Sequence, residues 1–430
     1  MIKKLLLLLV LALTCLNLVA GVRDDMRTNP LLAANNYRAY PDDSLPTLTA
    51  APAGYEPFYI DHYGRHGSRW LISPDQYGYS VEVLEKAQAA GKITARGMEV
   101  LAIAKQIKQA ADGRLGELSD KGAEQHQRIA RRMYSNFPQV FAGDARVDAK
   151  STIVIRCILS MQNATDALKS LNPGLRITTD ASQHDMKFMN FTDTVADKLR
   201  RPVYKKLYNE IKRRYVNTSY TLGRLFADTV WAKQNCDDMR LIFNLADLAG
   251  NMQSHHQFEH VNLYDLFTAD ELYSVWACNN AGWYIYAGFT PATRERVPYM
   301  EANLLRDFIS TADAHVASGE NGANLRFGHE SVVLPLVALM GLDGYDYSTA
   351  NVDDIYALAD RWQSYKVFPM ACNVQWVFYR NAAGDVLMKV LLNEHEAHLP
   401  AAVKPVNFPY YRWSDVRAYY EQRLAAQPKP

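Results

Sequence analysis

A glycine-containing stretch in the first quarter of the chain has the residue types and spacing for work on an anion. Arg65, His66 and Arg69 lie close together there, with Gly67 between the last two. The aromatic and β-branched residues at 58–60 predict the end of a buried strand, and glycine allows a sharp exit from it. Open α/β sheets bind ligands at the carboxyl ends of their strands. Two arginines beside a histidine therefore predict an anion site that holds a nucleophile, although the short run alone also fits a solvated basic turn.

A second histidine and a carboxylate follow another predicted strand. Residues 324–328 form a short, largely apolar run that ends in glycine, and His329 and Glu330 come directly after it. The apolar residues that follow predict a helix that ends near Gly341, because glycine is a typical residue just past a helix. A histidine and a carboxylate thus stand at a second strand-to-helix junction.

A third arginine lies in an unusually apolar run. Residues 151–160 predict a strand with Arg156 toward its carboxyl end. An arginine buried there without a partner would be costly. It therefore either meets a carboxylate or points into the anion site beside Arg65 and Arg69.

These residue types supply each part needed to hydrolyse a phosphate monoester. The reaction needs an in-line nucleophile, charge neutralisation around the phosphoryl oxygens and an acid for the leaving oxygen. His66 would attack, and Glu330 would protonate the leaving group and later activate the water. We expect bound phosphate to raise the pKa of Glu330, which the arginines oppose only in part. The phosphoryl group would be held by Arg65, Arg69, Arg156 and His329. This chemistry requires no metal and no cofactor.

Composition sets limits on partners. The chain has 430 residues, of which 48% are hydrophobic, so it can bury one large core or two ordinary ones. The formal net charge is +1, so no global field favours nucleic acid or an anionic membrane surface. Selectivity for a small phosphorylated molecule must therefore be local.

The N-terminus predicts an exported protein. Two lysines precede an apolar run over residues 5–13, and small residues follow at Ala20 and Gly21. This pattern is typical of a signal peptide, here residues 1–20, and the run is too short to span a bilayer. We expect a periplasmic or secreted protein. Lipid attachment at Cys15 is the less favoured alternative, because residues 12–14 suit it poorly.

The remaining cysteines permit disulfides in an oxidising compartment without requiring any. Cys157 and Cys372 adjoin apolar runs and are predicted to be buried thiols, whereas Cys236 with Cys278 is the pairing to test first. No cysteine spacing indicates a metal site. The histidine-rich residues 254–260 are predicted to form a polar, solvated loop.

Hydrophobic periodicity divides the chain into alternating α/β and helical parts. Helical spacing is predicted over 73–113, from a cap at Ser119, and over 301–316, while 175–179 predicts a strand. Residues 370–379 and 386–393 predict a hairpin that extends the sheet. We expect a signal peptide at 1–20, α/β segments at 22–180 and 301–430, and an inserted all-helical cap at 181–300. Most of a basic run in the cap is predicted to be solvated, with a minority reaching a polyanionic substrate: Arg200, Arg201, Lys205, Lys206, Lys212, Arg213 and Arg214.

Together these stretches resemble the histidine acid phosphatases, in particular the multiple inositol polyphosphate phosphatase branch. The resemblance covers most of residues 56–400 and is weakest in the cap. It implies an α/β, phosphoglycerate-mutase-like sandwich, in which helices flank a central mixed sheet, with an inserted helical cap. It also implies a phosphohistidine on His66, inositol polyphosphates such as phytate as substrates, and a substrate contact from Lys187. The alternatives are a broad acid phosphatase acting on sugar or nucleotide monophosphates, and a non-enzymatic periplasmic binder of phosphorylated ligands.

Two departures from the family pattern stand out. Relatives have proline shortly after the second arginine, where this chain has Trp70 and Leu71. Relatives also have either His-Asp or His-Ala-Glu, whereas here Glu330 follows His329 directly. The carboxylate is therefore at the aspartate position with one extra methylene, which alters the expected geometry of the proton donor.

Overall fold

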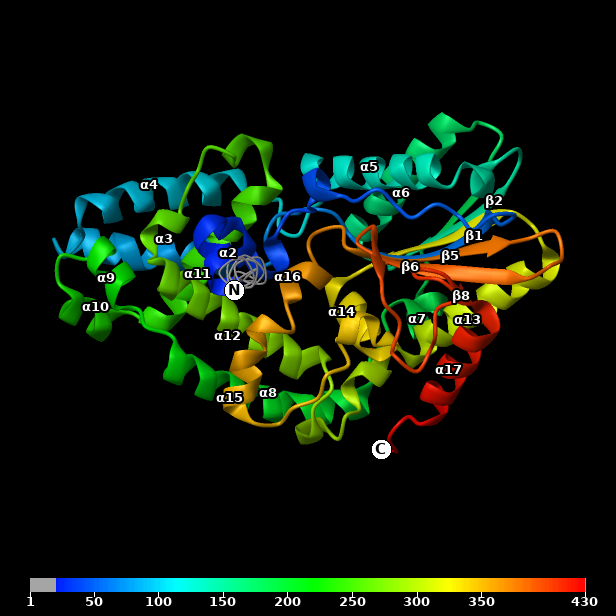
Figure 1. The fold of residues 1–430 in the computed structure, drawn as a ribbon. Helices are drawn as coiled ribbons and strands as arrows, with labels where there is room; N and C mark the ends of the chain where they lie inside the picture. The colour runs from blue at the N-terminus through cyan, green and yellow to red at the C-terminus, as the bar shows by residue number, and fades with distance from the viewer. Residues whose placement is uncertain (1–20, 430) are drawn as a thin grey trace, which may run out of the picture.

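The computed structural model describes residues 21–429, and the predicted signal peptide lies outside them. Figure 1 shows a sheet with helices on both faces and a mainly helical region beside it. Among the described residues, no helix combines the length and the apolar character needed to span a membrane.

The sheet is mixed, as predicted. Its strand order is β3-β2-β4-β1-β5-β6-β7, with β8 also paired to β6. The strands from β3 to β1 run parallel, whereas β5 pairs with β1, and β6 with β5, in the antiparallel sense. The predicted hairpin of β5 and β6 is confirmed and extends the sheet beyond β1. The strands are β1 (Glu56–Arg65), β2 (Arg146–Ser151), β3 (Arg176–Asp180), β4 (Gly322–Gly328), β5 (Asn373–Arg380), β6 (Val386–Leu392), β7 (His395–Ala397) and β8 (Tyr411–Arg412).

Helices cover both faces of this sheet (Figure 1). One face packs Ile60 and Leu325 against α5 (Asp120–Asn136) and α6 (Ile155–Leu171). The other packs Trp376 beneath α13 (Ala302–Ser318), α14 (Glu330–Met340) and α17 (Trp413–Ala425). Because both faces are covered, the central strands β1 and β4 are buried almost throughout, and charged side chains there are paired, as Arg326 of β4 is with Asp61 of β1. The predicted α/β class, with a mixed sheet between helices, is confirmed.

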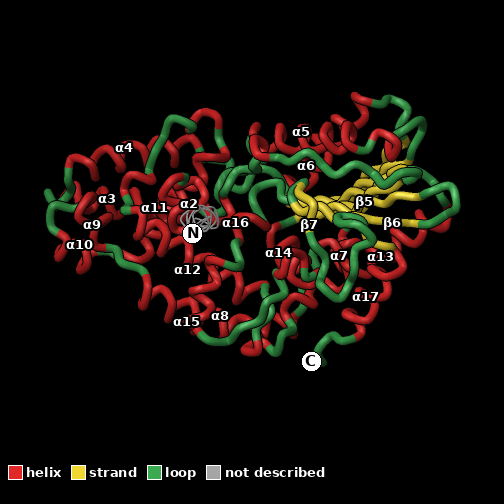
Figure 2. The backbone as a smooth tube through the Cα atoms, in the orientation of Figure 1, coloured by secondary structure: helices red, strands yellow, loops and turns green. Residues whose placement is uncertain are grey.

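The helical region lies beside the sheet, where Figure 2 shows helix and loop and no strand. Residues 181–300 are helical, as predicted, but α3 and α4 share a core with α11 and α12, through residues such as Leu84, Ala104, Leu245 and Trp276. In space the helical layer thus draws on two stretches of chain, and the sequence boundaries of the cap remain a prediction. Its helices are α3 (Pro74–Ala89), α4 (Ala95–Ala110), α8 (Thr194–Tyr215), α9 (Ser219–Leu225), α10 (Thr229–Asn235), α11 (Asp238–Asn251) and α12 (Ala269–Ala287). Shorter helices are α2 (Val22–Thr28), α7 (Met186–Met189), α15 (Val352–Ala357) and α16 (Ser364–Val367).

The strand predicted at 151–160 is wrong. Strand β2 ends at Ser151, and α6 begins at Ile155, so Arg156 lies in the first turn of a helix. The buried side chains Cys157, Met161 and Leu168 recur at helical spacing. Short apolar runs do not separate strand from helix by periodicity alone, and here the helix continues well beyond the run.

The structure tests the predictions for the cysteines and for the histidine-rich loop. The described cysteines are all free, so Cys236 and Cys278 form no disulfide, and Cys157 and Cys372 are buried thiols as expected. The histidine-rich loop is only partly solvated. His255 is buried with its ring centroid 4.0 Å from that of Trp70, because the bulky residue after Arg69 needs a partner in the helical layer.

The start of α5 packs closely against the loop that follows β1. Ser119 caps the helix, as predicted, by accepting a hydrogen bond from Gly122 N at 3.2 Å, and Ser119 N donates to Ser68 O at 2.9 Å. A Cβ added at Gly122 would lie 2.2 Å from Ser68 O, and one at Gly67 would lie 2.3 Å from Gly122 O. Glycine at both positions lets helix and loop touch through their backbones.

We therefore expect Gly122→Ala to lower the free energy of unfolding by about 2 kcal/mol, because backbone atoms must move to admit the methyl group. Urea denaturation monitored by circular dichroism measures this change. Gly78→Ala is the matched control, because a Cβ added at this position in α3 would meet no atom within 4 Å, and the substitution should be neutral or stabilising. Equal stability of the two variants would contradict the close approach.

Candidate active site

Parallel pairing of β1 with β4 brings the two predicted junctions together. Arg65 ends β1 and is paired with Gly328, which ends β4. The next residue, His66, donates its backbone N–H to Gly328 O at 2.9 Å. His329 and Glu330 leave β4 at the same edge, so both sets of side chains lie at the carboxyl ends of adjacent strands.

His66 is buried and is oriented by one hydrogen bond. Its Nδ1 lies 2.8 Å from Gly67 O, and because a carbonyl only accepts, Nδ1 carries the proton. Nε2 has no hydrogen-bond partner among the described residues. Burial, and then the charges of Arg65, Arg69 and Arg156, holds the pKa of His66 well below its ordinary value. The imidazole is therefore neutral, with the lone pair of Nε2 available for attack on an electrophile.

Three arginines face this histidine with unused donors. Arg65 donates through Nη1 to Asn36 O at 2.7 Å and to Phe368 O at 2.9 Å, and Arg69 donates through Nη1 to Trp70 O at 2.9 Å. Four buried guanidinium nitrogens of these three arginines find no hydrogen-bond acceptor among residues 21–429: Arg65 Nε, Arg65 Nη2, Arg69 Nε and Arg156 Nε. Buried donors are almost always paired, so this convergence marks an anion site.

The two alternatives for Arg156 can be separated. In the part of the chain that the structure describes, no carboxylate forms an ion pair with it within 4.0 Å. Burial, and then the nearby charge of Arg69, lowers the pKa of the Arg156 guanidinium. The charge of Arg156 thus acts on both Arg69 and His66, although Arg156 comes from a helix N-terminus rather than from a strand.

Glu330 is the carboxylate of the site. Its Oε2 lies 3.0 Å from Arg65 Nε and 3.8 Å from His66 Nε2, and its Oε1 accepts from Asn36 Nδ2 at 3.2 Å. Burial raises the pKa of Glu330, but the charges of Arg65 and Arg69 outweigh burial and bring the pKa to about 2. A phosphoryl group bound to the same arginines would share their charge and raise this pKa again.

His329 lies across the site from His66, with ring centroids 5.8 Å apart. Its Nε2 is 3.2 Å from Thr152 Oγ1. Burial lowers its pKa to about 4, although Glu330 opposes the fall. His329 is therefore neutral near pH 7 and can donate one hydrogen bond without adding charge.

One group of side chains has the composition of a metal site. The ligand atoms of His66, His329 and Glu330 lie within 4.8 Å of one another. However, Arg65, Arg69 and Arg156 surround the same space, and their positive charge opposes a divalent cation and favours an anion. The charge of the site thus supports the prediction that the chemistry needs no metal.

Several supporting residues were not predicted from the sequence. Asn36 belongs to a 3-10 helix, η1 (Pro30–Tyr37). Gln125 exchanges two hydrogen bonds with Ser68, and Asn251 Nδ2 donates to Arg69 O at 2.9 Å. These contacts join segments far apart in sequence, and no local pattern indicates them.

Lys187 is not brought into this cluster. It lies on α7 with its side chain exposed, and its Nζ is 2.9 Å from His184 Nε2. The same helix is joined to β1, because Tyr63 Oη donates to Met189 O at 2.8 Å. A substrate contact from Lys187 remains a prediction.

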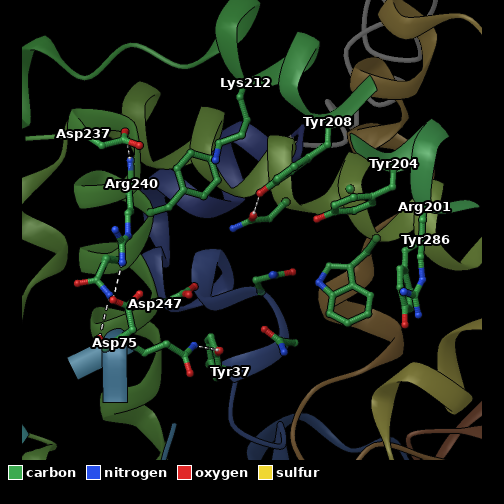
Figure 3. A pocket seen from close by; sticks show the side chains of 18 of the residues that line it. Tyr37, Asp75, Arg201, Tyr204, Tyr208, Lys212, Asp237, Arg240, Asp247 and Tyr286 are labelled. Carbon is green, nitrogen blue, oxygen red and sulfur yellow. Dashed lines mark hydrogen bonds and ion pairs between the residues drawn. The ribbon is translucent and has the colours of Figure 1, made fainter. Parts of the chain in front are cut away.

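A cavity of about 820 Å³ lies in the helical layer, and Figure 3 shows most of the side chains that line it. Its walls come from η1 and α3 on one side and from α8, α11 and α12 on the other. Asn36 links the two spaces, since it lines the cavity and also donates to Glu330. The catalytic residues themselves do not line this cavity, so its connection to the catalytic cluster runs through side chains such as Asn36.

Solved phosphatase structures share this architecture. A multiple inositol polyphosphate phosphatase from Bifidobacterium longum, in complex with inositol hexasulfate, matches with a TM-score of 0.73 and 20% identity, covering 92% of this chain and 97% of that one. The phytase from D. castellii matches with a TM-score of 0.65 and 13% identity, covering 92% and 85%. A Hafnia alvei phytase matches with a TM-score of 0.53 and 14% identity, covering 89% and 100%. No protein-family model and no curated protein sequence matches this chain. At these identities the likeness establishes the fold.

The contact between Glu330 and Arg65 leads to a binding prediction. Because the carboxylate competes with an anion for Arg65 and repels it, Glu330→Gln should bind inorganic phosphate about tenfold more tightly than the unmodified protein at pH 7. Isothermal titration calorimetry measures the dissociation constant. Glu82→Gln, which removes an exposed carboxylate from α3, should leave binding unchanged. Weaker phosphate binding by Glu330→Gln would show that the carboxylate does not oppose the anion.

Proposed function

We propose that this protein is a phosphomonoesterase that hydrolyses inositol polyphosphates, phytate among them, through a phosphohistidine on His66. The observation that carries the proposal is the neutral Nε2 of His66 beside buried guanidinium donors that lack acceptors among the described residues. The neighbouring structures, an inositol polyphosphate phosphatase and phytases, support the substrate class.

In the first step, the Nε2 lone pair of His66 attacks phosphorus while the bond from phosphorus to the leaving oxygen breaks. Arg65, Arg69 and Arg156 stabilise the charge on the phosphoryl oxygens, and neutral His329 donates one more hydrogen bond. The carbonyl of Gly67 holds the Nδ1 proton and so supports the positive charge that develops on the ring. The product of this step is a phosphohistidine.

Glu330 acts at the leaving oxygen. A phosphoryl group bound to the arginines raises the pKa of Glu330, so the carboxyl is protonated for part of the time at mildly acidic pH and can donate to the departing alkoxide. The resulting carboxylate then takes a proton from the water that attacks phosphohistidine. Water oxygen bonds to phosphorus, the bond between phosphorus and Nε2 breaks, and phosphate leaves.

The alternatives are less well supported. A non-enzymatic binder would not need a carboxylate beside His329, whereas Glu330 lies 3.8 Å from the nucleophile. A broad acid phosphatase would share the chemistry, but the adjoining cavity of about 820 Å³ gives room for a large substrate. We also propose export to the periplasm or beyond, which rests on the pattern of residues 1–20 alone.

We expect the purified protein to release phosphate from phytate in the presence of a chelator, and His66→Ala to lower kcat by several powers of ten, because no neighbouring group replaces the in-line imidazole. Phosphate release measures the rate, and circular dichroism checks that the variant is folded. Near-normal turnover by folded His66→Ala would refute the mechanism.

The proton donor can be tested through the leaving group. Glu330→Gln should slow phytate hydrolysis by about 100-fold or more, because its alkoxide leaving group needs a proton. The effect on p-nitrophenyl phosphate should be much smaller, since nitrophenolate departs without one. Steady-state kcat on both substrates measures the difference, and Glu330→Asp should retain part of the activity. Equal losses on both substrates would assign Glu330 to positioning or water activation instead.

A further inference from the structure

The cavity beside the site contains several cations, and most of them are already engaged. Arg200 donates through Nε to Asp197 at 2.8 Å, and Arg201 donates to the same carboxylate at 2.8 Å. Arg240 forms an ion pair with Asp75. Each of these three arginines is thus paired with a protein carboxylate before any substrate binds, although Arg200 and Arg201 share the single charge of Asp197.

Lys212 differs from the other cations that line the cavity. Its Nζ lies 4.2 Å from the ring centroid of Phe243 and 5.1 Å from that of Tyr208. Within residues 21–429, no carboxylate oxygen lies within 4.0 Å of this ammonium. The aromatic rings hold the cation in place without neutralising it. Figure 3 shows the side chain extending from α8 toward the pocket.

Asp247, which lines the same cavity, is influenced by the charges of both Lys212 and Arg69. Burial raises the pKa of Asp247 to about 7, and the charges of Arg69 and Lys212 oppose this rise. The pKa of Asp247 thus depends on the charges of both Arg69 and Lys212. In mildly acidic solution its carboxyl is mostly protonated, so it neither neutralises Lys212 nor repels an anion strongly.

Only some of the basic residues on α8 line the cavity. Arg200, Arg201 and Lys212 line the cavity, whereas Lys205 and Lys206 are exposed elsewhere on the helix. The prediction that a minority of this run faces a ligand is therefore consistent with the geometry. It also provides a matched control, because Lys206 carries the same charge on the same helix outside the cavity.

We propose that Lys212 binds a phosphoryl group of the substrate other than the one held at His66, and so favours polyphosphorylated over monophosphorylated substrates. This inference rests on the proposed function and adds a specificity-determining residue to it. An ammonium without a carboxylate partner, in a cavity that shares Asn36 with the phosphoryl site, suits a second phosphate on the same molecule. A charge-assisted hydrogen bond of this kind contributes to binding and leaves the chemical step unchanged.

The test compares Lys212→Met with Lys206→Met on two substrates. For phytate, Lys212→Met should raise KM about tenfold with kcat within about twofold, because it removes one charged hydrogen bond from binding. For p-nitrophenyl phosphate, which has no second phosphate, its kinetics should match those of the unmodified enzyme. Lys206→Met should have the same kcat and KM as the unmodified enzyme on both substrates. Lys212→Arg should retain most of the affinity for phytate.

A second readout does not depend on phytate turnover. Inositol hexasulfate carries the charge pattern of phytate but is not a phosphate ester, so it should inhibit hydrolysis of p-nitrophenyl phosphate competitively. Lys212→Met should raise its inhibition constant about tenfold, and Lys206→Met should not.

The outcomes separate this inference from the proposed function. If the unmodified enzyme hydrolyses p-nitrophenyl phosphate but neither hydrolyses phytate nor is inhibited by the hexasulfate, the proposed substrate class is wrong. If it hydrolyses phytate and Lys212→Met does so with an unchanged KM, the inference about Lys212 alone is overturned. Equal losses on both substrates would also overturn it, since Lys212 would then act through the fold or the catalytic cluster.

Discussion

The concentration of positive charge around one buried histidine is the constraint on which the rest of the structure depends. Arg65 and Arg69 are buried, Arg156 is partly buried, and donor nitrogens of all three lack acceptors among the described residues. Such groups oppose folding, because burial strips them of water. Glu330 balances part of the charge, with a pKa held at about 2 as the result. A bound phosphoryl group can neutralise the remaining positive charge. The buried arginines that lower the stability of the fold therefore also provide the affinity for an anion.

Placing these charges requires support from both layers of the molecule. The parallel pairing of β1 and β4 sets Arg65 and His66 against the start of α14, and the backbone contact with α5 fixes the loop from the sheet side. From the helical side, Asn251 holds Arg69 O, and His255 packs on Trp70. The nucleophile is thus positioned by the fold, and the helical layer is free to shape the cavity that receives the rest of the substrate.

Local sequence signals were sufficient wherever the chemistry follows a strand end directly. The run around His66, the pair at 329–330 and the hairpin of β5 and β6 all follow from glycine positions and short-range hydrophobic patterns. Arg156 was placed beside the site but on the wrong element, because its apolar run also fits the first turns of a helix. Asn36 could not be predicted, since it reaches Glu330 across nearly three hundred positions. The direction of Lys212 depends on how α8 packs, which a run of basic residues does not reveal.

The most direct test of the central claim is to trap the phosphorylated enzyme. The enzyme is quenched rapidly with alkali during turnover of a phosphate ester, and acid is avoided throughout. Peptide mapping then identifies the residue that carries the phosphoryl group. The account predicts an alkali-stable, acid-labile phosphoryl group on His66, formed at a rate no slower than turnover. Turnover with no phosphoryl group on His66, or with the group on another residue, would contradict it.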